Sequence, residues 1–81
     1  MVMFVAFSDR SETLRLYNDL KARGVMTSVI STPREAAVGC GLSVRFNATD
    51  LARVRSVLNS RARKGLIGVF KNVGGAVSRL F

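Results

Sequence analysis

The feature that most constrains the fold is the apolar run at positions 2–7, Val-Met-Phe-Val-Ala-Phe. A run of this length and composition is typical of a β-strand, and apolar side chains on both of its faces indicate a central, buried strand. A chain of 81 residues has room for one small domain. We therefore expect a single domain built around this strand.

Hydrophobic spacing predicts two helices and three further strands after this run. The first helix follows capping residues around Asp9 and ends at Gly24, and the second follows Asp50. The apolar positions of the first helix are Thr13, Leu14, Leu16, Tyr17 and Leu20, and those of the second are Leu51, Val54, Val57 and Leu58. The further strands are predicted at residues 25–30, 42–46 and 66–70. Alternation in the 42–46 strand predicts that Ser43 and Arg45 face outward.

The order strand-helix-strand-strand-helix-strand predicts a ferredoxin-like α+β sandwich. Its four-stranded antiparallel sheet would carry two helices on one face and leave the other face open. Residues 1–70 form this domain, and residues 71–81 form a C-terminal tail that is either flexible or docked on a neighbour. A core this small gives limited stability, which partner binding would increase, and we predict a homodimer as one form of such binding.

The stretch 32–41 holds the only proline and the only cysteine of the chain. Thr32 and Glu35 have the spacing of a capping box, and Pro33 suits the first position of a short helical turn. Gly39 ends that turn, so Cys40 lies between two glycines and can be approached closely. A lone cysteine is most often a small buried hydrophobe, and that reading stays open.

The residue inventory excludes most nucleophilic and metal chemistry. The chain has no histidine, which rules out Ser-His-Asp and Cys-His catalysis and histidine-based metal sites. A single cysteine rules out an internal disulfide, a Cys-x-x-Cys pair and a multi-cysteine zinc site. We predict no cofactor and no metal. Arg34, Arg45 and the amides around Gly39 and Gly41 would stabilise a Cys40 thiolate, whereas the end of the short helical turn opposes it.

The chain resembles the selenium/sulfur carrier protein-like family of small bacterial proteins. The resemblance rests on Pro33-Arg34-Glu35, a short spacer, and then Cys40-Gly41-Leu42 followed by an alternating strand that contains Arg45. The resemblance runs from the first predicted strand, with Ser8 after it, through the fourth. The spacer 36–39 departs from the family pattern because it lacks small hydroxyl residues.

This resemblance implies a carrier rather than a stand-alone enzyme. Cys40 would carry sulfur as a persulfide, or selenium in the equivalent form, from a cysteine desulfurase-like donor to an acceptor protein. The carrier thiol would be served by Arg34, Gly39 and Gly41 and supported by Thr32, Pro33, Glu35 and Arg45. Such transfer needs one exposed, nucleophilic sulfur and no acid–base pair.

The net charge of +8 falls mainly in the second half of the chain. Residues 1–40 hold five Lys or Arg and four acids, whereas residues 41–81 hold eight Lys or Arg and one acid. We predict an anionic-partner patch made of Arg53, Arg55, Arg61, Arg63 and Lys64, for an acidic protein surface or a nucleic acid.

Two other functions stay open beside the carrier. One is a basic ferredoxin-like module that binds nucleic acid, since residues 64–70 faintly echo the RNP1 pattern without its stacking aromatics. The other is a small interaction subunit with a buried Cys40 and no thiol chemistry. The N-terminus lacks the pattern of a signal peptide and no apolar run can span a bilayer, so we expect a cytoplasmic protein without membrane contact.

Overall fold

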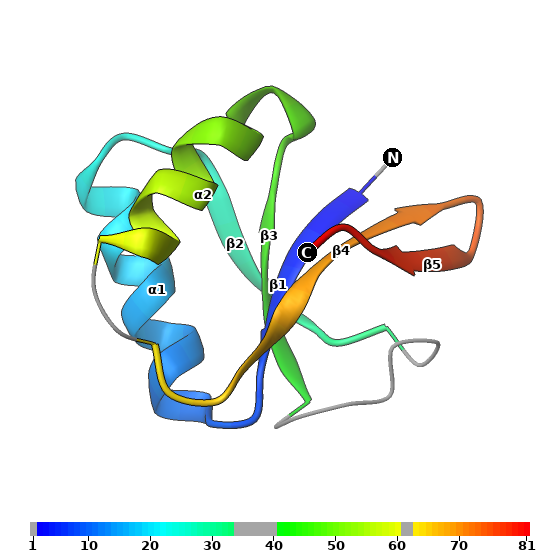
Figure 1. Ribbon diagram of the computed structural model, residues 1–81, viewed down its shortest axis with the longest axis horizontal. Coiled ribbons are helices and arrows are strands. Elements are labelled where there is room, and N and C mark those ends of the chain that lie inside the picture. Colours follow the sequence, from blue (N-terminus) through cyan, green and yellow to red (C-terminus); the bar gives the residue numbers. More distant parts are fainter. Residues whose placement is uncertain (1, 34–40, 61–62) are drawn as a thin grey trace.

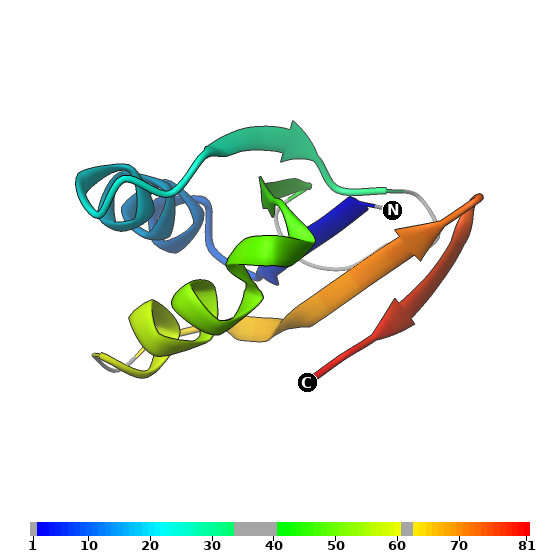
Figure 2. The ribbon, with the colours of Figure 1, turned by 90° about the horizontal axis from the view of Figure 1, so that it is seen from above.

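The computed structural model describes residues 2–33, 41–60 and 63–81 (Figure 1). Within these residues one antiparallel sheet has the strand order β2-β3-β1-β4-β5. Both helices lie on one face of this sheet (Figures 1 and 2). The elements are β1 (Val2–Phe7), α1 (Arg10–Ala22), β2 (Thr27–Ser31), β3 (Leu42–Phe46), the short 3-10 helix η1 (Ala48–Asp50), α2 (Leu51–Asn59), β4 (Leu66–Val73) and β5 (Ala76–Arg79).

The core lies between the sheet and the two helices. The central strand β1 contributes Met3, Val5 and Phe7, as its apolar composition predicted. The helices contribute Leu16, Leu20, Val54, Val57 and Leu58, with Tyr17 and Leu51 packed at the margin. Leu14 is 38% exposed, so its place in the buried stripe was wrong. It lies one residue past Thr13, which turns it about 100° away from the core-facing side.

The end of α1 explains why β2 starts later than predicted. The amide of Gly24 donates to the Lys21 carbonyl at 3.0 Å, and the amide of Val25 donates to the Leu20 carbonyl at 3.0 Å. This pair of bonds is a Schellman motif, and Gly24 takes the positive φ of 76° that the motif requires. Val25 is buried beside Leu20 in the core cluster, so it closes the helix and β2 begins only at Thr27.

The prediction of a four-stranded sheet was wrong because the chain forms a fifth strand after residue 70. β4 continues to Val73, and Gly74 and Gly75, with φ of 58° and 89°, turn the chain into β5. A Gly-Gly pair suits this turn because both residues adopt positive φ without strain. Beyond β5, Leu80 donates its amide to the Val69 carbonyl at 2.7 Å and packs against the core. Residues 71–79 therefore continue the sheet of this chain, and docking of residues 71–81 on a neighbour stays a prediction.

The face of the sheet opposite the helices is called the helix-free face below. The strand registers place Arg45 beside Phe4, Phe4 beside Phe70 and Phe70 beside Arg79. Since Val5 and Val69 point into the helix-side core, these four alternate residues lie on the helix-free face. The Phe4 and Phe70 rings stack with centroids 5.4 Å apart and planes 15° from parallel.

Candidate functional site

The connection from β2 to β3 carries Cys40, and both of its ends are fixed to the sheet. Ser31 pairs with Leu42 in the β2–β3 ladder. One residue further out, the Thr32 amide donates to the Gly41 carbonyl at 2.8 Å. Gly41, the next residue after Cys40, has a φ of 85° that disfavours any residue with a side chain. The ladder therefore ends directly beside the candidate thiol in sequence.

A pair of hydroxyl groups braces this end of the ladder. The Thr32 Oγ1 and Ser43 Oγ atoms are 2.7 Å apart, across the two strands. Ser43 faces away from the helices as predicted, but its expected exposure was wrong because it is fully buried. A buried hydroxyl needs a partner, and Thr32 supplies it. Sequence reasoning missed this pair, because the alternation of β3 gives Ser43 and the exposed Arg45 the same outward position.

The residues predicted to be central to the site lie outside the described residues. Arg34, Glu35, Gly39 and Cys40 fall in the segment 34–40, and so does the second half of the predicted capping box. The thiolate contacts expected of these residues therefore stay predictions. Thr32, Pro33, Gly41 and Arg45 are described, and Pro33 is partly buried.

The register brings Ser8 to the same end of the sheet as Gly41. β1 runs antiparallel to β3, so Ala6 pairs with Ser43, and the chain leaves the sheet at Ser8 near the start of β3. The Ser8 amide donates to the Gly65 carbonyl at 2.7 Å. Gly65 has a φ of 69°, and a Cβ atom there would also collide with the Ser8 hydroxyl, so glycine is favoured at this position. This end of the sheet thus gathers the hydroxyls of Ser8, Thr32 and Ser43.

Arg45 lies further along β3 than Gly41, and its predicted contact with the Cys40 thiol stays a prediction. It is four residues past Gly41 on β3, which corresponds to about 13 Å of strand. It pairs with Phe4 and Ser28, and its side chain is exposed on the helix-free face. The described structure therefore groups Thr32, Pro33 and Gly41 but sets Arg45 apart from them.

The predicted anionic-partner patch does not form one exposed cluster in the described residues. Arg53 and Arg55 are exposed on α2, and Lys64 is exposed before β4. The Arg55 guanidinium lies over the Phe81 ring at 4.7 Å, and Arg53 donates to the Arg23 carbonyl at 3.1 Å. Arg61 lies outside the described residues. These cations thus belong to different parts of the helical layer and its border.

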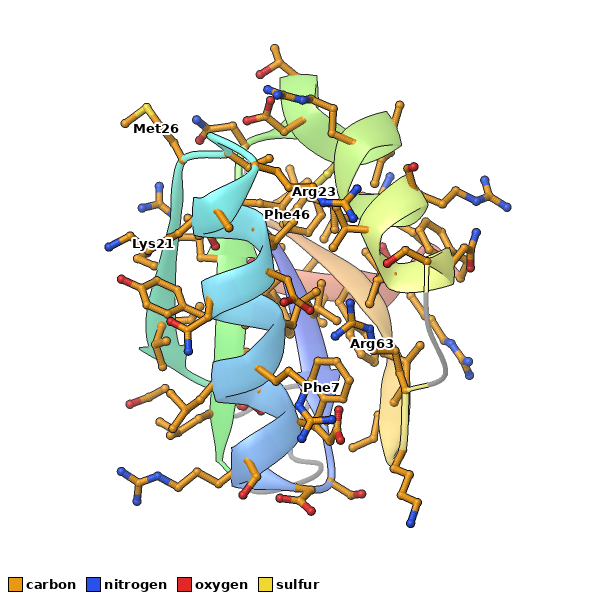
Figure 3. The ribbon with its side chains drawn as sticks, turned by 90° about the vertical axis from the view of Figure 1, so that its left-hand side faces the viewer. Phe7, Lys21, Arg23, Met26, Phe46 and Arg63 are labelled. Atoms are coloured by element: carbon orange, nitrogen blue, oxygen red, sulfur yellow. The ribbon has the colours of Figure 1, made fainter. Side chains whose placement is uncertain are left out.

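Arg63 has to be removed from that patch because its side chain is only 2% exposed. Its Nη1 lies 3.0 Å from the Asp19 carboxylate of α1, and its Nη2 donates to the Val57 carbonyl of α2 at 3.0 Å. Figure 3 shows the side chain directed inward against the helices rather than toward solvent. Arg63 therefore ties the two helices together, and a partner outside the chain cannot reach its charge.

A hollow of about 320 Å³ lies where the end of α1 meets α2, and it is lined by Arg23, Val25, Ala52, Arg53, Ser56 and Val57. This is the opposite end of the sheet from Gly41, since β2 starts there and ends at the candidate site.

The described residues contain no group of His, Cys, Asp and Glu that could hold a metal ion. In the same residues, no helix is both long and apolar enough to cross a membrane.

The fold is that of a small α+β protein, and its single cysteine falls in sequence within the connection from β2 to β3. Residues 3–64 match the family described as Putative Se/S carrier protein-like, and the chain belongs to this family. The match includes the whole 32–41 stretch but ends before β4, so it is shorter than the resemblance suggested. Neither the curated proteins nor the solved structures contain a match to the chain.

Proposed function

We propose that the protein carries sulfur or selenium on Cys40. The observation that carries the proposal is the family match over residues 3–64, which includes Cys40 and both anchored ends of its segment. Cys40 is the only thiol of the chain, so a carrier atom has one place to bind. The absence of histidine fits this role, because group transfer between sulfur atoms needs no acid–base pair.

The transfer step exchanges one sulfur–sulfur bond for another. The Cys40 thiolate attacks the outer sulfur of a persulfide on a cysteine desulfurase-like donor. The donor's sulfur–sulfur bond breaks, its thiolate leaves, and a new sulfur–sulfur bond forms on Cys40. No net oxidation occurs and no cofactor is consumed. An acceptor thiolate then repeats the same step on the Cys40 persulfide.

The described residues support this role by fixing the frame around the thiol. The Thr32–Gly41 hydrogen bond and the Thr32–Ser43 hydroxyl pair hold the ends of the segment against the sheet. A fixed frame lowers the conformational entropy that the segment loses when it docks on a donor or acceptor. We also infer a ferredoxin-like core for β1 to β4, supported by the order β2-β3-β1-β4 with a helix in each crossover.

The decisive experiment measures atoms added to Cys40. The reduced protein is incubated with a cysteine desulfurase and cysteine, or with inorganic polysulfide, and its intact mass is recorded. We expect the mass of one sulfur atom to be added and then removed by dithiothreitol. Cys40→Ser is the matched control, because it removes the only thiol and should gain nothing.

Further measurements on the same protein distinguish the carrier function from the two alternative functions. A thiol reagent that labels Cys40 only in denaturant, together with no sulfur gain from either donor, would contradict the carrier function and favour an interaction subunit. Polyselenide supplied in place of polysulfide tests the second cargo, because the thiolate can cleave its selenium–selenium bond and release the shorter polyselenide without an oxidant. Single-stranded RNA binding that persists in Cys40→Ser and weakens with salt would support the nucleic-acid module instead.

A further inference from the structure

The helix-free face presents two arginines on either side of an aromatic pair. The registers place Arg45, Phe4, Phe70 and Arg79 in one row across four neighbouring strands. Three inter-strand spacings separate the two arginines, which amounts to about 14 Å between their backbones. Both arginine residues are exposed, Phe70 is half-buried and Phe4 is buried. The row is therefore a cationic surface with a mostly covered apolar centre.

No Asp or Glu side chain of the described residues pairs with the two arginines of this row. The four described acids, Asp9, Glu12, Asp19 and Asp50, lie in the helices or at their starts. Three of them pair with Arg15, Arg63 and Arg53, and Asp9 caps α1. None of the described ion pairs involves Arg45 or Arg79. Among the described residues, the acidic side chains are thus engaged in the helical layer, and the helix-free face keeps an excess of positive charge.

The backbone of β4 is adapted to the position of Arg79. A Cβ atom on Gly68 would lie 2.9 Å from the Arg79 Nε and 3.0 Å from the Phe81 carbonyl oxygen. The Arg79 side chain thus lies across Gly68, and its Nε donates to the Phe81 carbonyl at 3.3 Å. This contact holds the side chain against the sheet, which reduces the rotamer entropy lost when it binds a carboxylate.

The aromatic pair favours a protein segment over a nucleic acid. Phe4 and Phe70 turn their ring faces toward each other, and Phe4 has no exposed surface. Base stacking needs a free aromatic face, and Phe4 has none. Ring edges carry partial positive charge, so the surroundings of the pair are compatible with carboxylates.

We propose that the helix-free face binds an extended, acidic segment of a partner protein. In an extended segment, residues i and i+4 lie on the same side and about 13 Å apart, close to the spacing of the two arginines. Acidic residues at these positions reach Arg45 and Arg79, and an apolar residue at i+2 covers Phe70. Because the thiol takes no part, this binding is independent of the carrier function.

The test uses fluorescence anisotropy with a labelled peptide of the repeat Glu-Ser-Leu-Ser. A peptide of the same composition but without the four-residue spacing and oligouridine serve as competing probes. The variant is Arg45→Glu with Arg79→Glu. The matched control is Arg15→Glu with Lys21→Glu, which changes the net charge equally but on the exposed side of α1. Circular dichroism verifies that both variants are folded.

The spaced peptide should bind, and the Arg45/Arg79 variant should weaken it at least about tenfold, as expected for two charge-assisted contacts. The control should change binding less than about twofold, because exposed charges distant from the site are screened by salt. Equal losses in both variants, equal binding of the rearranged peptide, or tighter oligouridine binding through the same arginines would each overturn the proposal.

Amide chemical shifts can be measured on the unmodified protein, so this test does not depend on whether a variant folds. Addition of the spaced peptide should move the signals of Gly68, Phe70 and Arg79 more than those of α1. The Cys40→Ser variant should bind with unchanged affinity, so a failed sulfur transfer leaves this result intact. Shifts confined to the helices would place the peptide elsewhere and refute the assignment.

Discussion

The two faces of the sheet use the same strands for different purposes. The helix side buries apolar side chains beneath α1 and α2, and the acids in that layer have partners in the chain. The helix-free face carries Arg45 and Arg79 around the Phe4–Phe70 pair, with no described carboxylate beside them. The helix side thus supplies the main apolar core, and we propose that the arginines of the other face serve a partner.

The largest expected change in stability comes from removing one large apolar side chain from each face of the sheet. Leu16→Ala should lower the free energy of unfolding by about 2–5 kcal/mol, because Leu16 is fully buried in the helix-side core. Phe70→Ala should cost about 1–2 kcal/mol, since the ring is half-buried and loses mainly its stacking on Phe4. Urea unfolding measures both, and equal costs would remove the distinction between the faces.

Breaking the Arg63–Asp19 pair should have the next effect. Arg63→Met should destabilise the protein by about 2–3 kcal/mol, which is less than for a fully buried pair because Asp19 remains 22% exposed. The double variant Arg63→Met with Asp19→Leu should recover part of this loss, because it removes both charges of the described pair from the helical layer. A neutral single variant in thermal unfolding would show that the pair does not hold the helices together.

Gly68→Ala tests the packing of the helix-free face itself. The added methyl group would press on Arg79 and on the Phe81 carbonyl, so we expect a loss of about 1–3 kcal/mol. Gly24→Ala is a suitable control, because a Cβ atom there meets nothing within 4 Å and only backbone strain is added. If Gly68→Ala also weakened the acidic peptide, the position of Arg79 would be shown to matter for binding.

The hydroxyl pair at the candidate site should contribute less. Ser43→Ala leaves the Thr32 hydroxyl without its described partner and should cost about 1 kcal/mol in chemical unfolding. Thr32→Val with Ser43→Ala removes both hydroxyls and should be closer to neutral. The rate of Cys40 labelling should rise in the single variant, because one tie between the ladder and the thiol segment is lost. An unchanged rate would separate the pair from the site.

The smallest expected change in stability comes from the two exposed arginines, and it is the most informative test of the difference between the two faces. Arg45→Ala with Arg79→Ala should change the free energy of unfolding by no more than about 0.5 kcal/mol, because both side chains are exposed and unpaired with acids in the described residues. The same variant should abolish the preference for the spaced acidic peptide. A large loss of stability in thermal unfolding would mean that the arginines serve the fold and not a partner.

Periodicity alone was sufficient to predict most of the fold. The buried strand at residues 2–7, the α2 stripe and the 42–46 strand were all correct, because burial of apolar side chains fixes their spacing. The fifth strand was missed because Lys71 and Asn72 interrupt the apolar pattern of β4. The Gly74-Gly75 pair between two strand-like segments was the signal that could have revealed it.

The candidate site could be predicted only in part. The spacing of Thr32, Cys40 and Gly41 located the connection that the structure anchors between β2 and β3. The burial of Arg63 was not predictable, since its carboxylate partner lies on a helix far away in sequence. The Ser43 hydroxyl pair likewise depends on the register of two strands, which the composition of either strand does not determine.

The late hairpin has a consequence for solubility. Without β5, the apolar β4 would be an outer strand with unpaired backbone groups, and such strands recruit other chains into aggregates. β5 occupies those groups and makes the outer border a four-residue strand that ends in a positive charge. Short, charged border strands resist further pairing. The residues after the family match thus cover the β4 side of the sheet, whereas β2 forms the outer strand on the other side.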